Sequence, residues 1–193
     1  MGEGIGMAIT AVGAWMLLLF VVVNFAVAAA GARIGGRSHY TEIWYDSLRK
    51  PASYPPEWVF APVWSCVAIV TGLAGWLIWR QWMQGADATA LVLYGFCLGF
   101  NAVWQGEVFG LRRLGLGLAF AWLLWGTLAL TMLYTAADGT WDWLWLIPYW
   151  VWVAYGLRLN HALWARNQVR ALPPSSLASA TEEAEASPEP PPQ

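Results

Sequence analysis

Charged residues are scarce in this chain of 193 residues. Only 11% of the residues are Asp, Glu, Lys or Arg, against 59% that are hydrophobic, whereas an ordinary soluble domain carries about 25% charge. This apolar surface exceeds what one soluble core can bury, so the excess must face lipid. The net charge is −2 and no stretch is rich in Lys and Arg, which argues against a nucleic-acid partner. The length is that of a single domain.

Residues typical of metal sites and nucleophilic catalysis are missing as well. Cys66 and Cys97 fall within apolar runs, so they indicate neither a disulfide framework nor a metal site. His39 and His161 have no Cys or carboxylate neighbour at ligand spacing, and no Ser/His/Asp or Cys/His set is present. We therefore expect no metal and no required cofactor.

Long apolar runs dominate the chain instead. Each is close to the roughly 20 residues that a helix needs to cross a bilayer, and polar loops separate them. They predict an all-α integral membrane protein, a bundle of five transmembrane helices at residues 7–31, 58–79, 88–109, 114–134 and 143–164. We expect one membrane domain over residues 7–166, preceded by a short segment, 1–6.

The two ends of the chain raise separate points. A signal peptide is an alternative for the first run, because Ala26-Val27-Ala28 loosely resembles a cleavage site, but the residues before it include Glu3 and no Lys or Arg. Residues 167–193 are rich in Pro, Ser, Ala and Glu, a composition that cannot bury apolar area. We expect this tail to be disordered.

Basic residues are unevenly divided between the two predicted sides. Arg80 alone lies on one side, and the other side holds eight: Arg33, Arg37, Arg49, Lys50, Arg112, Arg113, Arg166 and Arg170. Short basic loops stay cytoplasmic. This distribution predicts that the C-terminus is cytoplasmic and that the N-terminus lies outside. We expect the protein to reside in the cell (inner) membrane.

Tryptophan is abundant, with 16 residues. Most stand at the ends of the predicted helices, where an indole anchors in the headgroup region. Trp64, Trp104 and Trp152 differ, because they fall inside predicted helices beside polar residues.

These inner tryptophans belong to longer motifs. The motifs are Trp44-Tyr45-Asp46-Ser47-Leu48-Arg49-Lys50-Pro51, then Pro55-Pro56-Glu57-Trp58-Val59-Phe60-Ala61-Pro62-Val63-Trp64, then Asn101 and Trp104 with Phe109-Gly110, and finally Pro148-Tyr149, Trp152, Leu159-Asn160 and Trp164. Together they resemble the TspO/MBR family, also called translocator protein or tryptophan-rich sensory protein, over about residues 44–167. The sequence departs from the family pattern at Ser53 and at Gln105-Gly106-Glu107-Val108, which replaces an apolar and aromatic run.

The resemblance implies a five-helix bundle, often dimeric, with a ligand pocket capped by the first loop. Family members bind porphyrins and, in animals, cholesterol. The positions that match pocket or motif residues are Trp64, Asn101, Trp104, Tyr149, Trp152 and Asn160. The resemblance implies a binding protein for a tetrapyrrole such as protoporphyrin IX, or for a sterol-like molecule, that acts in sensing, sequestration or transfer. Its alternatives are a transporter and a light-dependent porphyrin-degrading enzyme, in which Trp64 and Trp152 would donate electrons.

Depth along the helices gives an independent prediction. At about 1.5 Å per residue, Trp64 and Trp104 both lie about 9 Å from the cytoplasmic helix ends, and Asn101 lies one turn deeper. Trp152 lies about 18 Å deep, as a floor beneath them, and the first loop forms a lid. Such an aromatic cavity with one amide suits a large planar ligand. The alternative is that the indoles only fill the bundle and Asn101 links helices.

Four more residues stand out within the predicted spans. Glu107 and Arg158 lie at similar depth, which predicts that they pair. Alternatively, Arg158 meets a ligand carboxylate, or it extends to the headgroups while Glu107 is solvated. Gly95 and Gly99 form a small-xxx-small pair, which indicates either a homodimer interface or a contact within the bundle.

Overall fold

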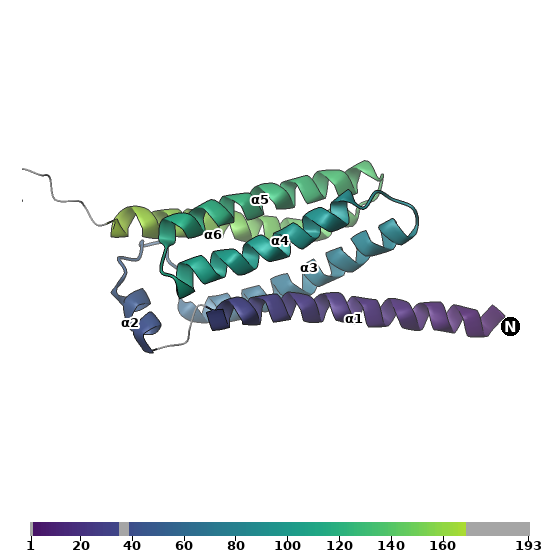
Figure 1. Cartoon of the computed structure of the whole chain (residues 1–193), viewed down its shortest axis with the longest axis horizontal. Helices are drawn as coiled ribbons and strands as arrows, with labels where there is room; N and C mark the ends of the chain where they lie inside the picture. The colour runs from purple at the N-terminus through teal and green to yellow at the C-terminus, as the bar shows by residue number, and fades with distance from the viewer. Residues whose placement is uncertain (1, 35–38, 169–193) are drawn as a thin grey trace, which may run out of the picture.

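A computed structural model describes residues 2–34 and 39–168, and these residues fold almost entirely into helices joined by short loops (Figure 1). The elements are α1 (Gly2–Ile34), α2 (His39–Ser47), η1 (Glu57–Val59), α3 (Phe60–Met83), α4 (Thr89–Gln105), η2 (Gly106–Gly110), α5 (Leu114–Ala137), η3 (Asp142–Leu146) and α6 (Ile147–Asn167). The predicted all-α fold is confirmed for this part of the chain. The predicted tail lies outside the described residues from position 169 onward.

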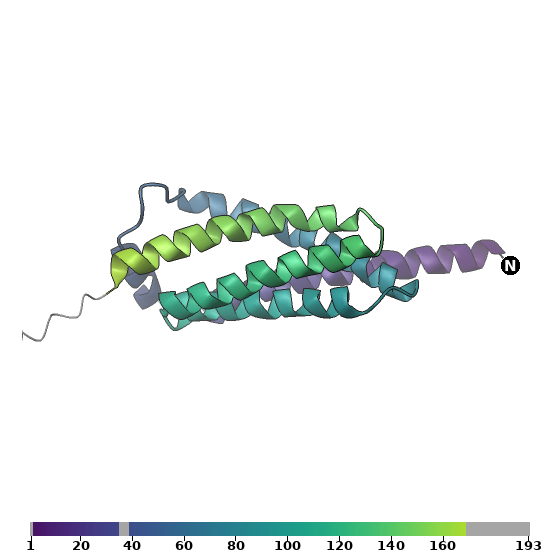
Figure 2. The same cartoon turned by 90° about the horizontal axis from the view of Figure 1, so that it is seen from above.

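The described ranges hold six α-helices, so the predicted count of five is not matched. Five of the helices are long and run side by side, and the short α2 lies at one end of them (Figures 1 and 2). The sequence predicts a loop between the first two spans, and α2 lies in this segment. Its nine-residue helix is too short and too polar to resemble a membrane span.

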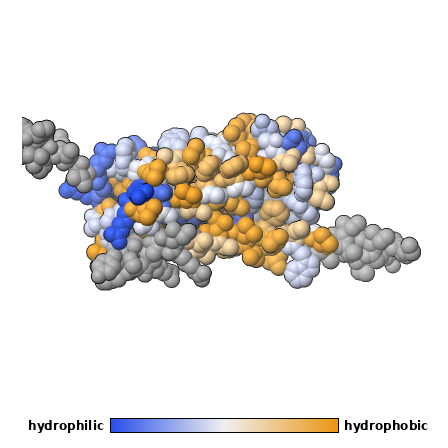
Figure 3. Space-filling model, in the orientation of Figure 1, coloured by the Kyte–Doolittle hydropathy of each residue, from blue (hydrophilic) through white to orange (hydrophobic). Residues whose placement is uncertain are grey.

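Within the part of the chain that the structure describes, three stretches are long and apolar enough to cross a membrane: Val12–Ala30, Glu57–Met83 and Leu114–Ala137. The other two long helices differ from these for local reasons. α4 has only 17 residues before it continues as the π-helical turn η2, and α6 carries Arg158, Asn160 and His161. Apolar side chains cover the middle of the visible face, and hydrophilic ones gather near α2 (Figure 3).

Two glycines of α3 allow α1 to pack closely. A Cβ atom at Gly72 would lie 2.7 Å from the Cα of Val21 in α1, and one at Gly75 would lie 2.8 Å from Cδ1 of Phe20 in α1 and 2.4 Å from Cζ of Tyr94 in α4. Asn24 of α1 donates a hydrogen bond to the Tyr94 hydroxyl at 2.6 Å, inside the bundle. Close backbone approach and one buried polar contact therefore join α1 to both α3 and α4.

The end of α4 is shaped by η2. The Leu111 N–H donates to the carbonyl of Gly106, five residues earlier, which is the spacing of a π-helix. Val108 of this turn packs on Gly117 of α5, where a Cβ would lie 2.4 Å from Cγ2 of Val108. This contact fixes the end of α4 against α5 next to the cavity described below.

Candidate ligand-binding site

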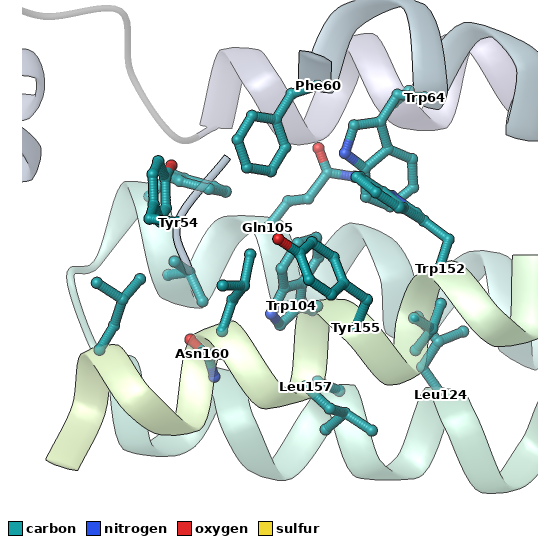
Figure 4. A pocket seen from close by; sticks show the side chains of 18 of the residues that line it. Tyr54, Phe60, Trp64, Trp104, Gln105, Leu124, Trp152, Tyr155, Leu157 and Asn160 are labelled. Atoms are coloured by element: carbon teal, nitrogen blue, oxygen red, sulfur yellow. The ribbon is translucent and has the colours of Figure 1, made fainter. Parts of the chain in front are cut away.

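A cavity of about 260 Å³ lies inside the bundle, near the end where α2 lies (Figure 4). Most of its lining comes from α3, α4, η2, α5 and α6, and it is completed by Ala28 of α1 and by Tyr45 and Tyr54 of the first loop, in which α2 lies. None of the described residues that line it carries a charge. The volume is near the lower end of the range for small-molecule sites, roughly 300–1,000 Å³. The cavity is therefore an apolar, largely aromatic chamber.

Trp64 stands at the centre of the aromatic wall. Its ring centroid lies 6.0 Å from that of Trp104 and 6.2 Å from that of Trp152. Phe60 extends the wall, with its centroid 6.0 Å from that of Trp152 (Figure 4). Tilted and edge-to-face rings at these separations attract each other beyond the effect of burial alone, so the wall is an ordered surface.

Trp152 does not form a floor beneath Trp64, and that prediction was wrong. The two rings are in edge contact with centroids 6.2 Å apart, which is less than the roughly 9 Å of depth that the prediction placed between them. The prediction counted residues from the cytoplasmic ends of the helices and assumed that these ends lie at the same depth. In the structure α6 extends beyond the start of α3 toward α2 (Figures 1 and 2), so the count from the end of α6 overestimated the depth of Trp152.

The six ligand-site residues expected from the sequence fall into two groups. Trp64, Trp104, Trp152 and Asn160 line the cavity, whereas Asn101 and Tyr149 lie behind its wall. Tyr149 is buried, with its ring edge against Trp64 at a centroid distance of 6.4 Å. Asn101 accepts a hydrogen bond at 3.2 Å from Nε2 of Gln105, which does line the cavity. The amide exposed to the cavity next to Trp104 is therefore that of Gln105.

Two further polar atoms in the cavity wall have no hydrogen-bond partner among the described residues. These are Nε1 of Trp104 and Oδ1 of Asn160, both fully buried. The other side-chain polar atom of Asn160, Nδ2, donates to the carbonyl of Leu114 at 3.2 Å. Buried polar atoms are normally paired, because an unpaired one retains its desolvation penalty. These atoms are a donor and an acceptor within the wall, with almost no surface exposed to the cavity.

The first loop covers the cavity and is tied to α6 by hydrogen bonds. The Tyr155 hydroxyl donates to the carbonyl of Ser53 at 3.1 Å. Near the end of α6, Oδ1 of Asn167 accepts from the Arg49 N–H at 2.9 Å. The hydroxyls of Tyr45 and Tyr54 lie 2.6 Å apart, and burial is the main cause that raises the pKa of Tyr45 above its ordinary value. Both rings therefore present neutral phenols to the cavity.

Lys50 holds the loop together from outside. Its ammonium lies 3.3 Å from Asp46 and 3.4 Å from Glu57, and it sits over the rings of Tyr45 and Tyr54, at 4.9 and 5.3 Å. Burial lowers the pKa of Lys50, but the hydrogen bonds with both carboxylates raise it, and the net pKa is above the ordinary value. Exposed ion pairs contribute only about 0–1 kcal/mol, so the ion pairs of Lys50 add little to the stability of the closed loop.

Glu107 and Arg158 do not pair, contrary to the sequence-based expectation. The ion pairs among the described residues are those of Lys50. Arg158 is exposed, whereas its neighbours Leu157 and Leu159 are buried, so it points away from the bundle. Glu107 lies in η2, and its Oε2 is buried with no partner in the described part of the chain. The prediction compared only the depths of Glu107 and Arg158. The sequence did not show how α6 is rotated about its own axis.

Gly95 and Gly99 lie on the outer face of α4. A Cβ atom at either position would meet nothing within 4 Å. The two glycines line an open apolar groove together with Val92, Phe96, Phe100, Val103 and Phe120. The structure therefore shows no contact of these glycines within the described bundle, which leaves the homodimer as the interpretation to test.

Several residues of the cavity were missed at the sequence level, among them Tyr45, Tyr54, Phe60, Tyr155 and Gln105. A signal existed for Gln105, which follows Asn101 by four residues and so shares its helix face. Tyr45 and Phe60 stand within the motifs that carry the resemblance but were not singled out, and no comparable signal existed for Tyr54, whose position depends on the path of the first loop.

The sequence as a whole matches known proteins. The sequence model described as the TspO/MBR family matches residues 10–165, most of the chain. The chain belongs to the TspO/MBR family. A translocator protein of Bos taurus is 34% identical over 130 residues, 66% of this chain and 76% of that protein. Protein CrtK of Rhodobacter capsulatus is 33% identical over 153 residues, 78% and 94% of the two chains. A tryptophan-rich sensory protein of Cereibacter sphaeroides is 31% identical over 161 residues, 81% and 98%.

Family membership and the apolar helices both indicate a membrane protein. TspO/MBR proteins are membrane proteins, and this chain has helices of the length and composition that a bilayer requires. The protein is therefore an integral membrane protein, as the sequence predicts.

Proposed function

We propose that this TspO/MBR protein binds a porphyrin, or a similar large planar and mostly apolar molecule, in the cavity beneath its first loop. The observation that carries the proposal is the aromatic wall around Trp64 in a cavity whose described lining has no charge. Planar apolar ligands are held by stacking on such rings and by few polar contacts. The names of relatives, translocator protein and tryptophan-rich sensory protein, favour a role in transfer or sensing, and sequestration is compatible with the same site.

The size of the cavity sets a condition on this proposal. A tetrapyrrole is larger than the 260 Å³ of this partly open cavity, so we expect the first loop to move when the ligand binds. The polar contacts that hold the loop are a few hydrogen bonds and exposed ion pairs, which contribute about 1 kcal/mol each or less. Trp44 and Leu48 also pack on the buried cluster of Val108, Leu114 and Leu163, so stacking of the ligand must offset the loss of this apolar contact as well.

The proposal is tested by titrating the purified protein in detergent with protoporphyrin IX in the dark. We expect saturable quenching of tryptophan fluorescence at about one ligand per chain, because the ligand would lie against Trp64, Trp104 and Trp152. Quenching that rises linearly without saturation, as for free partition into the detergent, would contradict the proposal.

A second candidate function is light-dependent porphyrin degradation, favoured by the direct contact of Trp64 and Trp152 in the cavity wall. Illuminating the saturated complex separates the two functions. Stable porphyrin absorbance indicates a binding protein. A new product that forms with the wild type, but not with Trp152→Phe, indicates the enzyme.

We also propose that the protein forms a homodimer through the groove at Gly95 and Gly99. The groove is apolar, faces outward and has room for a second helix, and small residues let helices approach closely. Gly95→Leu is expected to shift the protein from dimer to monomer without unfolding it, as measured by light scattering in detergent. The control is Gly126→Leu on α5, where a Cβ also meets nothing within 4 Å. A monomeric wild type, or an unchanged dimer in Gly95→Leu, would refute this interface.

A further inference from the structure

The side-chain amide of Gln105 is an unusual group in the cavity. Gln105 is only 9% exposed, and its side chain reaches toward the rings of Phe60, Trp64 and Trp152 (Figure 4). Placing an amide among aromatic rings is unfavourable unless its polar atoms find partners. The position of this amide within the binding cavity therefore requires an explanation.

Asn101 orients the Gln105 amide but satisfies only part of it. Nε2 of Gln105 donates to Oδ1 of Asn101 at 3.2 Å, and Asn101 itself is 6% exposed. A carboxamide has two N–H donors and an oxygen that accepts two hydrogen bonds. The second N–H and Oε1 have no partner among the residues that the structure describes. The amide therefore offers one donor beside one acceptor.

The pair of amides does not serve to join helices. Asn101 and Gln105 both lie on α4, one helical turn apart, so their hydrogen bond stabilises no contact between helices. The polar residues that do join helices lie elsewhere, as with Asn24 of α1 and Tyr94 of α4. The free edge of Gln105 is directed to the cavity, where a molecule that enters can complement it.

The complement of such an edge is an uncharged group with an acceptor beside a donor. A lactam or another cyclic amide has this arrangement, and Gln forms the same two-bond contact with adenine in nucleic-acid recognition. A carboxylate offers no donor, and burying its charge in this uncharged lining would be costly. A closed porphyrin has its N–H groups inside the ring, so its outer edge offers no donor.

We infer that Gln105 makes the cavity selective for planar, uncharged ligands that carry a lactam or similar donor–acceptor edge. This inference rests on the proposed function and refines it. An open-chain tetrapyrrole has such a lactam on each terminal ring. Asn101 acts as a positioning residue, because it fixes which edge of the Gln105 amide faces the cavity.

The test compares two ligands of similar size that differ in this edge. Biliverdin dimethyl ester has terminal lactams, protoporphyrin IX dimethyl ester has none, and both lack carboxylate charges. Dissociation constants are measured by fluorescence quenching in the dark for wild type, Gln105→Met and Asn101→Ala. Gln84→Met, an exposed position outside the cavity lining, is the matched control, and thermal unfolding confirms that each variant is folded.

We expect Gln105→Met to weaken biliverdin ester binding about tenfold, the effect of losing one or two hydrogen bonds, and to change porphyrin ester binding less than twofold. Asn101→Ala should weaken only biliverdin ester binding, to a smaller extent. Equal weakening for both ligands would show that Gln105 only shapes the cavity, and no weakening would show that it does not contact the ligand. Either result overturns the inference while the proposed function stands. If neither ester binds the wild type saturably, both are refuted.

Discussion

A single added methyl group at position 72 is expected to destabilise the bundle by about 1–3 kcal/mol, the usual effect of overpacking. Gly72 of α3 is buried, and a Cβ there would lie 2.7 Å from Cα and 3.0 Å from the backbone nitrogen of Val21 in α1. Backbone atoms cannot rotate out of the way as a side chain can. Gly72→Ala must therefore increase the separation between α1 and α3.

The matched control for this prediction is Gly126→Ala, on α5. A Cβ at Gly126 meets nothing within 4 Å, and alanine is favoured over glycine inside a helix by about 1 kcal/mol. The same substitution should therefore lower the melting temperature at position 72 and leave it unchanged or raise it at position 126. Circular dichroism during heating in detergent measures both. Equal melting temperatures for the two variants would show that α1 does not pack on α3 as described.

The long helices were predictable because the bilayer imposes a simple rule on the sequence. Each span needs about 20 apolar residues, so the runs of such residues locate the long helices to within a few positions. α2 escaped this rule because it has only nine residues and is polar. The π-helical turn η2 was not predicted either, because the polar Gln105 and Glu107 mark a break in the apolar run but do not specify the hydrogen-bond spacing of the helix there.

The aromatic wall was predictable in part. Counting residues from helix ends placed Trp64 and Trp104 at one level, and their rings are 6.0 Å apart. The same count was wrong for Trp152, because α6 extends past the start of α3 (Figures 1 and 2). Depth also says nothing of rotation about a helix axis, which is why Asn101 lies behind the wall and Arg158 faces outward.

The contacts of the first loop could not be predicted from the sequence. They join groups more than 100 positions apart, such as Tyr155 with Ser53 and Asn167 with Arg49. Two of these contacts use backbone atoms of the loop, whose direction no residue type specifies. The loop was expected to be a lid from the resemblance and from its place at the cavity end, but its anchors appear only in the folded chain.

The central claim is that the ligand binds inside the cavity beneath the first loop, and filling that cavity tests it most directly. Gly156 of α6 lines the cavity, and a Cβ there would meet nothing within 4 Å. A phenylalanine at this position has room to extend into the 260 Å³ available without displacing the helices. Gly126→Phe makes the same exchange at a position that is equally open but does not line the cavity.

The measurement is the dissociation constant of protoporphyrin IX in the dark for wild type, Gly156→Phe and Gly126→Phe, with melting temperatures recorded alongside. We predict that Gly156→Phe weakens binding by about 100-fold or more, equivalent to about 2.7 kcal/mol, at an unchanged melting temperature, and that Gly126→Phe binds like the wild type. Wild-type affinity in a folded Gly156→Phe variant would contradict the account and place the ligand outside this cavity.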